Sequence, residues 1–384
     1  MSQLEFANIL GGSGGHPRGV EKIIHQPIQG FPLAVLFEIF RSAGATVDRR
    51  HHDKAIYLWT MAPFLSLFAL RERQLYNQII HSTELVAPPI FVLGHWRSGT
   101  TLLHNFLGQD PNHTYPRAYQ SFTHGFFLLP RLKFFLNRIE RHIDLDQRPM
   151  DNVRFSFAEP WEDEFLMLSL TGISPYKRAL FPRWLGPESQ YRYPDFRTEE
   201  EIIRWKKTFQ RLMKRLTVLD NKRLVLKSPP HMGRINTLLD LYPEAKFIHI
   251  VRDPYAVFAS NLRVWRDGLS LSFLQDVTEA QLLEIVFSTY EQLFDLFFRT
   301  RWQIPEGHLV EVCFEDLVHN PMQTLAMIYK QLQLPGFDEA AHHMKSHLAG
   351  LGGYERNIFR LPRHMREIIH GRWHRVFETY GYSG

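Results

Sequence analysis

The sequence predicts an α/β fold with three layers, in which helices cover both faces of a central parallel sheet, and a helical extension at the N-terminus. Residues 90–93 form a continuous apolar run, as expected for a strand buried on both faces of a parallel sheet. Further apolar runs at 224–226 and 246–251 alternate with helical patterns. We therefore assign residues 88–384 to the main domain and residues 1–87 to the extension.

The extension contains two apolar tracts, 31–40 and 55–70. As a helix, the longer tract would span about 24 Å at about 1.5 Å per residue, less than the ~30 Å hydrocarbon core of a bilayer. Pro63 also argues against a single membrane span. We expect a helical layer packed on the main domain. The alternative is an interfacial helix, with peripheral membrane contact through residues 55–70.

Composition bounds the function. The chain has 384 residues, of which 44% are hydrophobic and 22% charged, as in ordinary globular proteins. The net charge of +5 comes without clustered basic tracts, so we expect anionic ligands and no nucleic-acid partner. Cys313 is the only cysteine, and the first residues lack a signal-peptide pattern, so we expect a cytoplasmic location. The oligomeric state is not indicated.

A polar turn, GHWRSGTT, follows the first strand at residues 94–101 and leads into a helix with apolar residues on one face. Free backbone N–H groups and the helix dipole make such a turn a pocket for a tetrahedral anion. The spacing from Gly94 to Gly99 is that of a P-loop, GxxxxGK[ST], but Thr100 stands in the lysine position. Nucleoside triphosphatases need that lysine and a metal held by carboxylates. The turn therefore predicts a P-loop-like fold that needs no metal; the alternative is an ordinary glycine turn.

A second stretch brings more cations to the same place. The strand at 224–226 ends before Lys227 and His231, and the strand at 246–251 ends at Arg252, with a predicted crossover helix between them. Ligands bind at the carboxyl ends of parallel strands, so these side chains should lie beside Arg97. Pro254 is expected as the first residue of the next helix.

On that helix, Ser260 lies eight residues after Arg252, and both can converge on a second anion beside the first. The two motifs together resemble those of sulfotransferases that use 3′-phosphoadenosine 5′-phosphosulfate (PAPS), above all the bacterial and tyrosylprotein-type members with a PRSGTT loop. The resemblance covers roughly residues 88–384. It implies that PAPS is the co-substrate and that no metal is required.

The resemblance also implies roles for individual residues. Arg97 would contact the sulfuryl group and its bridging oxygen, and Lys227 would help to carry charge on that group. The 3′-phosphate would be held by Arg252 and Ser260. The 5′-phosphate would be held by the turn, namely by Ser98, Gly99, Thr100 and Thr101 together with Arg97.

The catalytic base does not follow from the resemblance. The histidine of the KTH motif in cytosolic members would fall on Pro229, so His231 is a candidate two residues later, with a structural role as the alternative. The glutamate of tyrosylprotein-type relatives has no counterpart in residues 115–122, within a predicted loop at 111–130. Glu162 is the other candidate, although its acidic cluster is also typical of a helix N-terminus.

The sequence thus predicts a sulfotransferase in which a hydroxyl or amine attacks sulfur in line. The acceptor would be a small molecule, a lipid or a glycan. Two alternatives remain: a P-loop nucleotide kinase-like phosphotransferase, and a non-catalytic nucleotide-binding protein of the membrane surface. Thr100 in the lysine position argues against the kinase.

Overall fold

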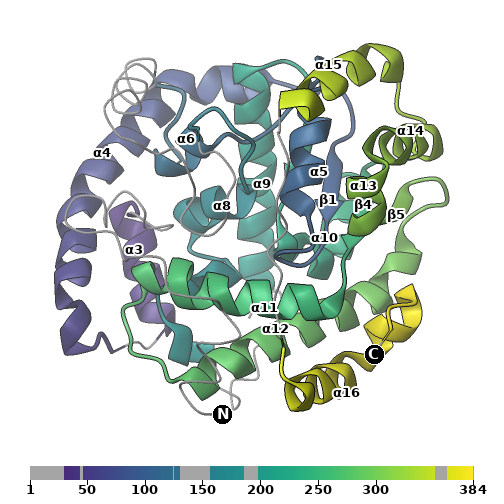
Figure 1. Ribbon diagram of the computed structural model, residues 1–384. Coiled ribbons are helices and arrows are strands. Elements are labelled where there is room, and N and C mark those ends of the chain that lie inside the picture. The colour runs from purple at the N-terminus through teal and green to yellow at the C-terminus, as the bar shows by residue number, and fades with distance from the viewer. Residues whose placement is uncertain are drawn as a thin grey trace.

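The computed structural model describes residues 30–43, 46–123, 125–129, 156–185, 198–350 and 361–383. These residues confirm the predicted α/β class, because they form helical layers around a five-stranded sheet (Figure 1). Its strands are β1 Ile90–Leu93, β2 His113–Thr114, β3 Arg223–Lys227, β4 Lys246–Val251 and β5 Leu309–Cys313. All are parallel, in the order β2-β3-β1-β4-β5.

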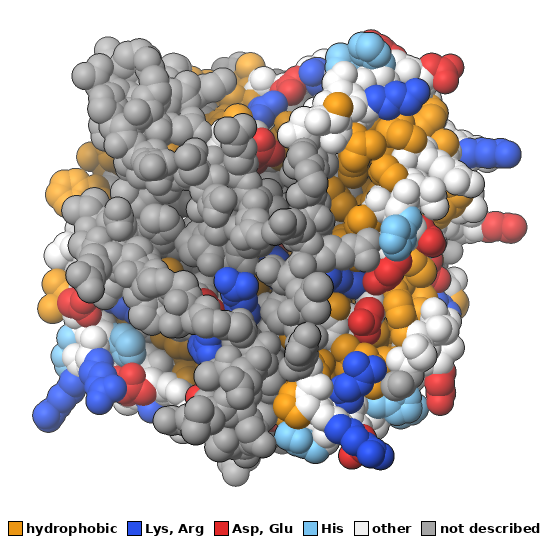
Figure 2. All heavy atoms as spheres, viewed as in Figure 1, with side chains coloured by type: hydrophobic (Ala, Val, Ile, Leu, Met, Phe, Trp, Pro, Cys, Tyr) orange, Lys and Arg blue, Asp and Glu red, His pale blue; other side chains and the backbone are white. Residues whose placement is uncertain are grey.

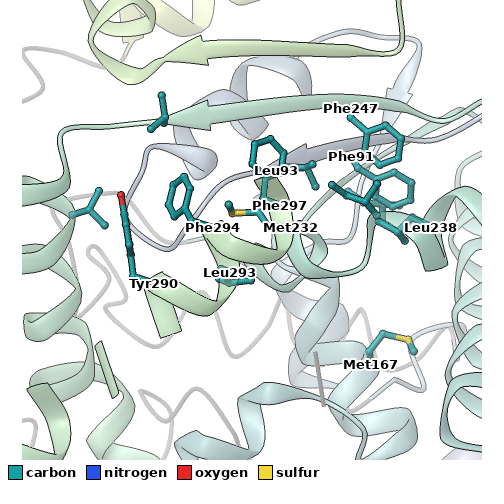
Figure 3. Close-up of a cluster of buried hydrophobic side chains, with 14 of the residues drawn as sticks. Phe91, Leu93, Met167, Met232, Leu238, Phe247, Tyr290, Leu293, Phe294 and Phe297 are labelled. Carbon is teal, nitrogen blue, oxygen red and sulfur yellow. The ribbon is translucent and has the colours of Figure 1, made fainter. Parts of the chain in front are cut away.

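Strand β1 is central and separates two hydrophobic clusters. Because successive side chains of a strand point to opposite faces, Phe91 and Leu93 enter one cluster, and Ile90 and Val92 enter the other. Figure 3 shows part of the first cluster, with Phe91 and Leu93 among other buried side chains. A strand buried on both faces fixes the position of the turn that follows it.

Helices on each face of the sheet supply the rest of these clusters. On the face of Phe91 they are α9 Glu199–Leu219, α10 Ile235–Leu241, α11 Pro254–Arg263, α12 Glu279–Thr300 and α16 Arg363–Tyr380. On the other face they are α5 Thr100–Leu107, α13 Phe314–His319, α14 Pro321–Gln331 and α15 Phe337–Gly350.

Local signals account for several helix starts. Pro254 is the first residue of α11, as predicted, and the Asp253 carboxylate accepts a hydrogen bond from the Tyr255 amide at 2.9 Å. Helix α9 begins after Thr198, whose hydroxyl accepts from the Glu201 amide. These caps satisfy amides that have no partner within the helix.

The two apolar tracts near the N-terminus are both helical, in α3 Leu33–Ala43 and α4 His52–Ser82, with a 3-10 turn at Arg49–His51 between them. Helix α4 continues through Pro63. In the described residues, no helix combines the length and the hydropathy needed to cross a bilayer.

One expectation about the main domain was wrong. The stretch 111–130, predicted as a loop, contains β2 and the short helix α6 Ala118–Phe122. Strand β2 exists because its two residues pair with β3, a long-range contact that leaves no local pattern. The predicted crossover from β3 to β4 passes over β1, which lies between these two strands and pairs with both.

Candidate active site

The turn after β1 is held in an unusual conformation. Gly99 has φ of 99°, and a β-carbon there would lie 2.2 Å from Cδ2 of Phe314, so only glycine fits. Arg97 also has a positive φ, 70°, which is strained for a residue with a side chain. Ser98 donates both its amide and its hydroxyl hydrogen to the His95 carbonyl, at 3.1 and 2.8 Å. Ser98 therefore closes the turn.

The two predicted anion positions lie side by side. Arg97 Nε donates to Ser260 Oγ at 2.8 Å, and Arg252 Nη1 donates to the Arg97 carbonyl at 3.2 Å. The guanidinium carbon of Arg252 lies 4.4 Å from the ring centre of Phe314, the residue that also contacts Gly99. One aromatic ring thus supports both positions.

Lys227 joins this edge of the sheet from the end of β3. It is buried, and its Nζ donates to Glu162 Oε1 at 2.7 Å and to Thr101 Oγ1 at 3.4 Å. The other carboxylate oxygen of Glu162 accepts a hydrogen bond from the Tyr176 hydroxyl, and Trp96 Nε1 donates to that hydroxyl at 3.0 Å. Glu162 is therefore a carboxylate held between a cation and a phenol.

A cavity of about 1090 Å³, part of it open to solvent, connects these groups. Its charged and polar end includes Arg97, Thr100, Thr101, Glu162 and Lys227. Its other walls are mainly apolar and include Trp161, Phe165, Pro175, Val264, Trp265 and Leu269. Such a cavity can hold an anion beside a carboxylate and an apolar molecule next to both.

The acidic cluster divides between structure and cavity. Helix α8 (Asp163–Thr171) begins at this cluster, as its composition indicated. Asp163 lies 2.8 Å from His231 Nε2, and both side chains are fully buried. Burial raises the pKa of Asp163, but its interactions with His231 and Ser228 outweigh this, so the pKa is lowered. Glu162, in contrast, lies on the cavity wall.

His231 does not line the cavity. Its ring packs edge-on against Phe91 and Phe209 in the core. This placement fits the structural alternative considered from the sequence. Among the predicted residues, Arg97, Thr100, Thr101, Glu162 and Lys227 meet in the cavity, and Arg252 and Ser260 adjoin Arg97.

The composition of residues 172–200, rich in Pro, Tyr and Arg, predicts a substrate-side loop, but it does not name the individual residues that line the cavity. Tyr176 and Arg178 lie on a short 3-10 helix, Pro175–Ala179, and Arg178 Nη1 donates to Thr289 Oγ1 of α12 at 2.8 Å. The Pro- and Tyr-rich composition after residue 171 was a weak signal for Tyr176. Thr289 lies within an amphipathic helix and has no local signal.

Known proteins are similar to this chain in sequence. The model of the "Sulfotransferase family" matches residues 88–339. The omega-hydroxy-beta-dihydromenaquinone-9 sulfotransferase Stf3 of Mycobacterium bovis is 31% identical over 350 residues, which cover 90% of this chain and 88% of that protein; Stf3 of Mycobacterium tuberculosis gives the same values.

Solved structures with a similar fold include two mycobacterial sulfotransferases. STF1 of Mycobacterium tuberculosis H37Rv has a TM-score of 0.63 and 22% identity, covering 89% of this chain and 90% of that one. STF9 of Mycobacterium avium has a TM-score of 0.64 and 19% identity, covering 90% and 95%. At these identities the structural likeness bears on the fold alone.

Proposed function

The chain belongs to the sulfotransferase family, and we propose that it transfers the sulfuryl group of PAPS to the hydroxyl of a lipid-like alcohol. Sulfuryl transfer follows from family membership. The donor is inferred from the family, and the acceptor is inferred from the cavity. The observation that carries the proposal is that Arg97 contacts Ser260 and that Arg252 contacts the Arg97 carbonyl, beside a cavity that Arg97 and Glu162 both line. This arrangement supports two neighbouring anion positions close to the Glu162 carboxylate.

The turn residues fit PAPS as a co-substrate. Gly99 keeps the turn free of side-chain atoms, and the first amides of α5 offer donors to a 5′-phosphate together with Thr100 and Thr101. Arg252 and Ser260 would hold the 3′-phosphate beside it. When bound, PAPS supplies the sulfuryl group and departs as adenosine 3′,5′-bisphosphate.

The cavity residues have distinct roles in this proposal. Arg97 and Lys227 stabilise negative charge that develops on the transferring group and the leaving oxygen, without reorganising during the reaction. Glu162 is the proposed base: its carboxylate accepts the proton of the acceptor hydroxyl as that oxygen bonds to sulfur. The phenol of Tyr176 orients the carboxylate. His231 is left with a structural role in the core.

The acceptor class is inferred from the apolar walls. A long apolar alcohol would bury its chain against Phe165, Val264 and Trp265 while its hydroxyl reached Glu162. A relative named for a hydroxylated menaquinone supports this class, whereas a glycan would leave its hydroxyls unpaired on these walls. With such an acceptor, we expect a cytoplasmic enzyme that meets the membrane peripherally through residues 55–70.

The test is transfer of radioactive sulfuryl from labelled PAPS to a panel of long-chain alcohols, phenols and sugars. We expect label on the long-chain alcohols. Glu162→Gln should lower turnover about 10²- to 10⁴-fold, the usual contribution of a general base. Binding of adenosine 3′,5′-bisphosphate, measured by calorimetry, should stay close to that of the unchanged protein.

Glu159→Gln is the matched control, because Glu159 belongs to the same acidic stretch but does not line the cavity. It should leave transfer unchanged. Label on sugars alone would contradict the acceptor class, and full activity of Glu162→Gln would remove Glu162 as the base. Tight binding of ATP with Mg²⁺ in place of PAPS would instead favour a kinase-like phosphotransferase.

A further inference from the structure

Helix α4 is apolar on two opposite sides. On its inner side Leu58, Ala62 and Leu65 are buried. On its outer side Ile56, Trp59, Pro63, Leu67 and Leu70 follow the i, i+3, i+4 spacing of a single helix face, and all five are exposed. Ile56 and Leu67 are each 63% exposed. Residues 55–70 include no charged side chain. A helix that is apolar all round usually lies in a core or at a membrane.

Helix α3 extends this surface. The Leu33 amide donates to Ser66 Oγ at 2.7 Å, and the Phe40 ring lies 5.4 Å from that of Trp59, so α3 runs antiparallel along α4. Phe37, between these contacts, is 60% exposed. We call the combined surface the outer face; it consists of Leu33, Phe37, Ile56, Trp59, Pro63, Leu67 and Leu70. Helix α4 forms the margin of the molecule, and hydrophobic side chains lie along that margin (Figures 1 and 2).

Arginines lie at both ends of the outer face. Arg49 and Arg50 precede α4, and Arg71 and Arg73 follow the apolar stretch, all of them exposed, with Asp53 as an exposed acid between. The stretch from Ile56 to Leu70 is about 21 Å long at about 1.5 Å per residue. We propose that the outer face docks in the plane of an anionic membrane, its apolar side chains entering the lipid and its arginines contacting lipid phosphates.

The charges favour lipid over a second copy of the chain. In a two-fold contact between copies of α4, each arginine-bearing end would face an arginine-bearing end of the partner, whether the helices were parallel or antiparallel. Like charges would then repel across an apolar contact. Anionic headgroups complement both ends at once.

The docked surface lies next to the cavity. The inner residues Leu58 and Ala62 belong to one hydrophobic cluster with Leu168, Tyr176 and Ala179, of which Tyr176 and Ala179 line the cavity wall. One hydrophobic cluster therefore connects α4 to the cavity wall. The step from docking to acceptor delivery rests on the proposed function, whereas docking itself does not.

Vesicle flotation with the full chain tests the docking. We expect the protein to float with vesicles of phosphatidylcholine and phosphatidylglycerol, and more weakly with phosphatidylcholine alone. The triple variant Ile56→Ser, Leu67→Ser, Leu70→Ser should lower binding at least about tenfold on both. Arg71→Gln with Arg73→Gln should lower binding about 25-fold on anionic vesicles only, because each basic residue near the surface contributes about fivefold.

Ile203→Ser with Ile368→Ser is the matched control, because these isoleucines are 46% and 45% exposed but lie outside the outer face. It should bind vesicles as the unchanged protein does. Thermal unfolding and nucleotide binding should be the same in all variants, so that lost flotation reports the surface. Transfer to a short, soluble alcohol should also persist in the triple variant, while transfer to a lipid alcohol in vesicles falls.

Three results would overturn the proposal. In the first, the triple variant floats as well as the unchanged protein. In the second, the unchanged protein binds no vesicles but forms a concentration-dependent dimer that the triple variant does not form. In the third, flotation appears only after removal of residues 1–29, which would identify that segment as the occupant of the outer face. Vesicle binding without transfer to any lipid alcohol would support docking and contradict the proposed acceptor. Transfer to a lipid alcohol without vesicle binding would support the proposed acceptor and contradict docking.

Discussion

The charged end of the cavity and the outer face of α3 and α4 are built in opposite ways. At the charged end, side chains have little freedom, because Arg97, Arg252 and Lys227 are each fixed by hydrogen bonds beside a backbone turn. On the outer face, the side chains are apolar and exposed, and they need no hydrogen-bond partners. The function of the charged end depends on the exact positions of a few groups, whereas docking through the outer face depends on the total apolar area. Single substitutions should therefore be severe in the first and mild in the second.

The largest effect should come from Arg97→Ala. In the proposed reaction Arg97 lies where charge develops, and loss of one such group typically lowers turnover about 10³-fold, or about 4 kcal/mol. Steady-state transfer with saturating PAPS measures this. Arg363→Ala, at a side chain 93% exposed, is the control. Turnover of Arg97→Ala near that of the control would show that the charged end does not act through this residue.

Gly99→Ala should come next. The new β-carbon would overlap Phe314, and the alanine would have to keep the unfavourable positive φ of this position. Together these two effects should lower the free energy of unfolding by about 3 kcal/mol. Urea unfolding measures it, and the double variant with Phe314→Ala should recover nucleotide binding in part. Gly371→Ala is the control, because no atom lies within 4 Å of the place that its β-carbon would take and helix α16 should tolerate alanine. Equal stability of the two variants would contradict the tight contact.

A smaller effect is expected for Arg252→Ala. Loss of one charged contact to a phosphate should weaken binding of adenosine 3′,5′-bisphosphate about 10- to 100-fold, or roughly 2 kcal/mol. Turnover at saturating PAPS should change much less. Calorimetry separates the two quantities. An unchanged dissociation constant for adenosine 3′,5′-bisphosphate together with a large loss of turnover would mean that Arg252 takes part in the transfer step. The distinction between the two anion positions would then be wrong.

The most gradual effect should be on acid stability, because it is spread over several pH units. Burial lowers the pKa of His95 to about 3, below its ordinary value of 6.5. The unfolded chain therefore binds a proton that the folded chain refuses, and stability falls as the pH drops from 6.5 towards 3, by at most about 1.4 kcal/mol per pH unit for this residue. Burial shifts the pKa of His113 and His249 in the same direction.

Urea unfolding between pH 4 and 7 tests this dependence. His95→Gln should reduce the slope by about one proton, whereas His364→Gln, at an exposed position, should not. An identical slope in all three proteins would mean that His95 is protonated while the protein is folded.

The sequence was most informative where function is local. Gly94, Arg97 and Gly99 lie within six residues of each other. Arg252 lies at the end of a strand, and Ser260 lies on the helix that follows it. The spacing of these residues therefore predicts two neighbouring anion positions. The fold class followed in the same way from apolar runs. The proposed base was harder to single out, because three adjacent acids look alike in sequence and only tertiary contacts separate Glu162 from its buried neighbours.

The apolar side of the cavity was predictable only in part, as a substrate-side loop within residues 172–200. Tyr176 and Thr289 meet there from segments more than a hundred residues apart, and neither carries a local motif. His231 shows the reverse case, a motif-like position that the fold turns into the core. The exposure of the outer face of α4 also needed the structure, because an apolar tract by itself does not say which of its sides is covered.

Phe314 has a consequence for which nucleotides the enzyme accepts. Because the same ring lies against Gly99 and the Arg252 guanidinium, the separation of the two proposed anion positions would be set by one rigid, planar group. Selection would then depend on how far apart a nucleotide carries its phosphates, before its base is contacted at all. An isomer phosphorylated at the 2′ rather than the 3′ oxygen could satisfy one position at a time, and would be rejected for its shape although its charge is the same.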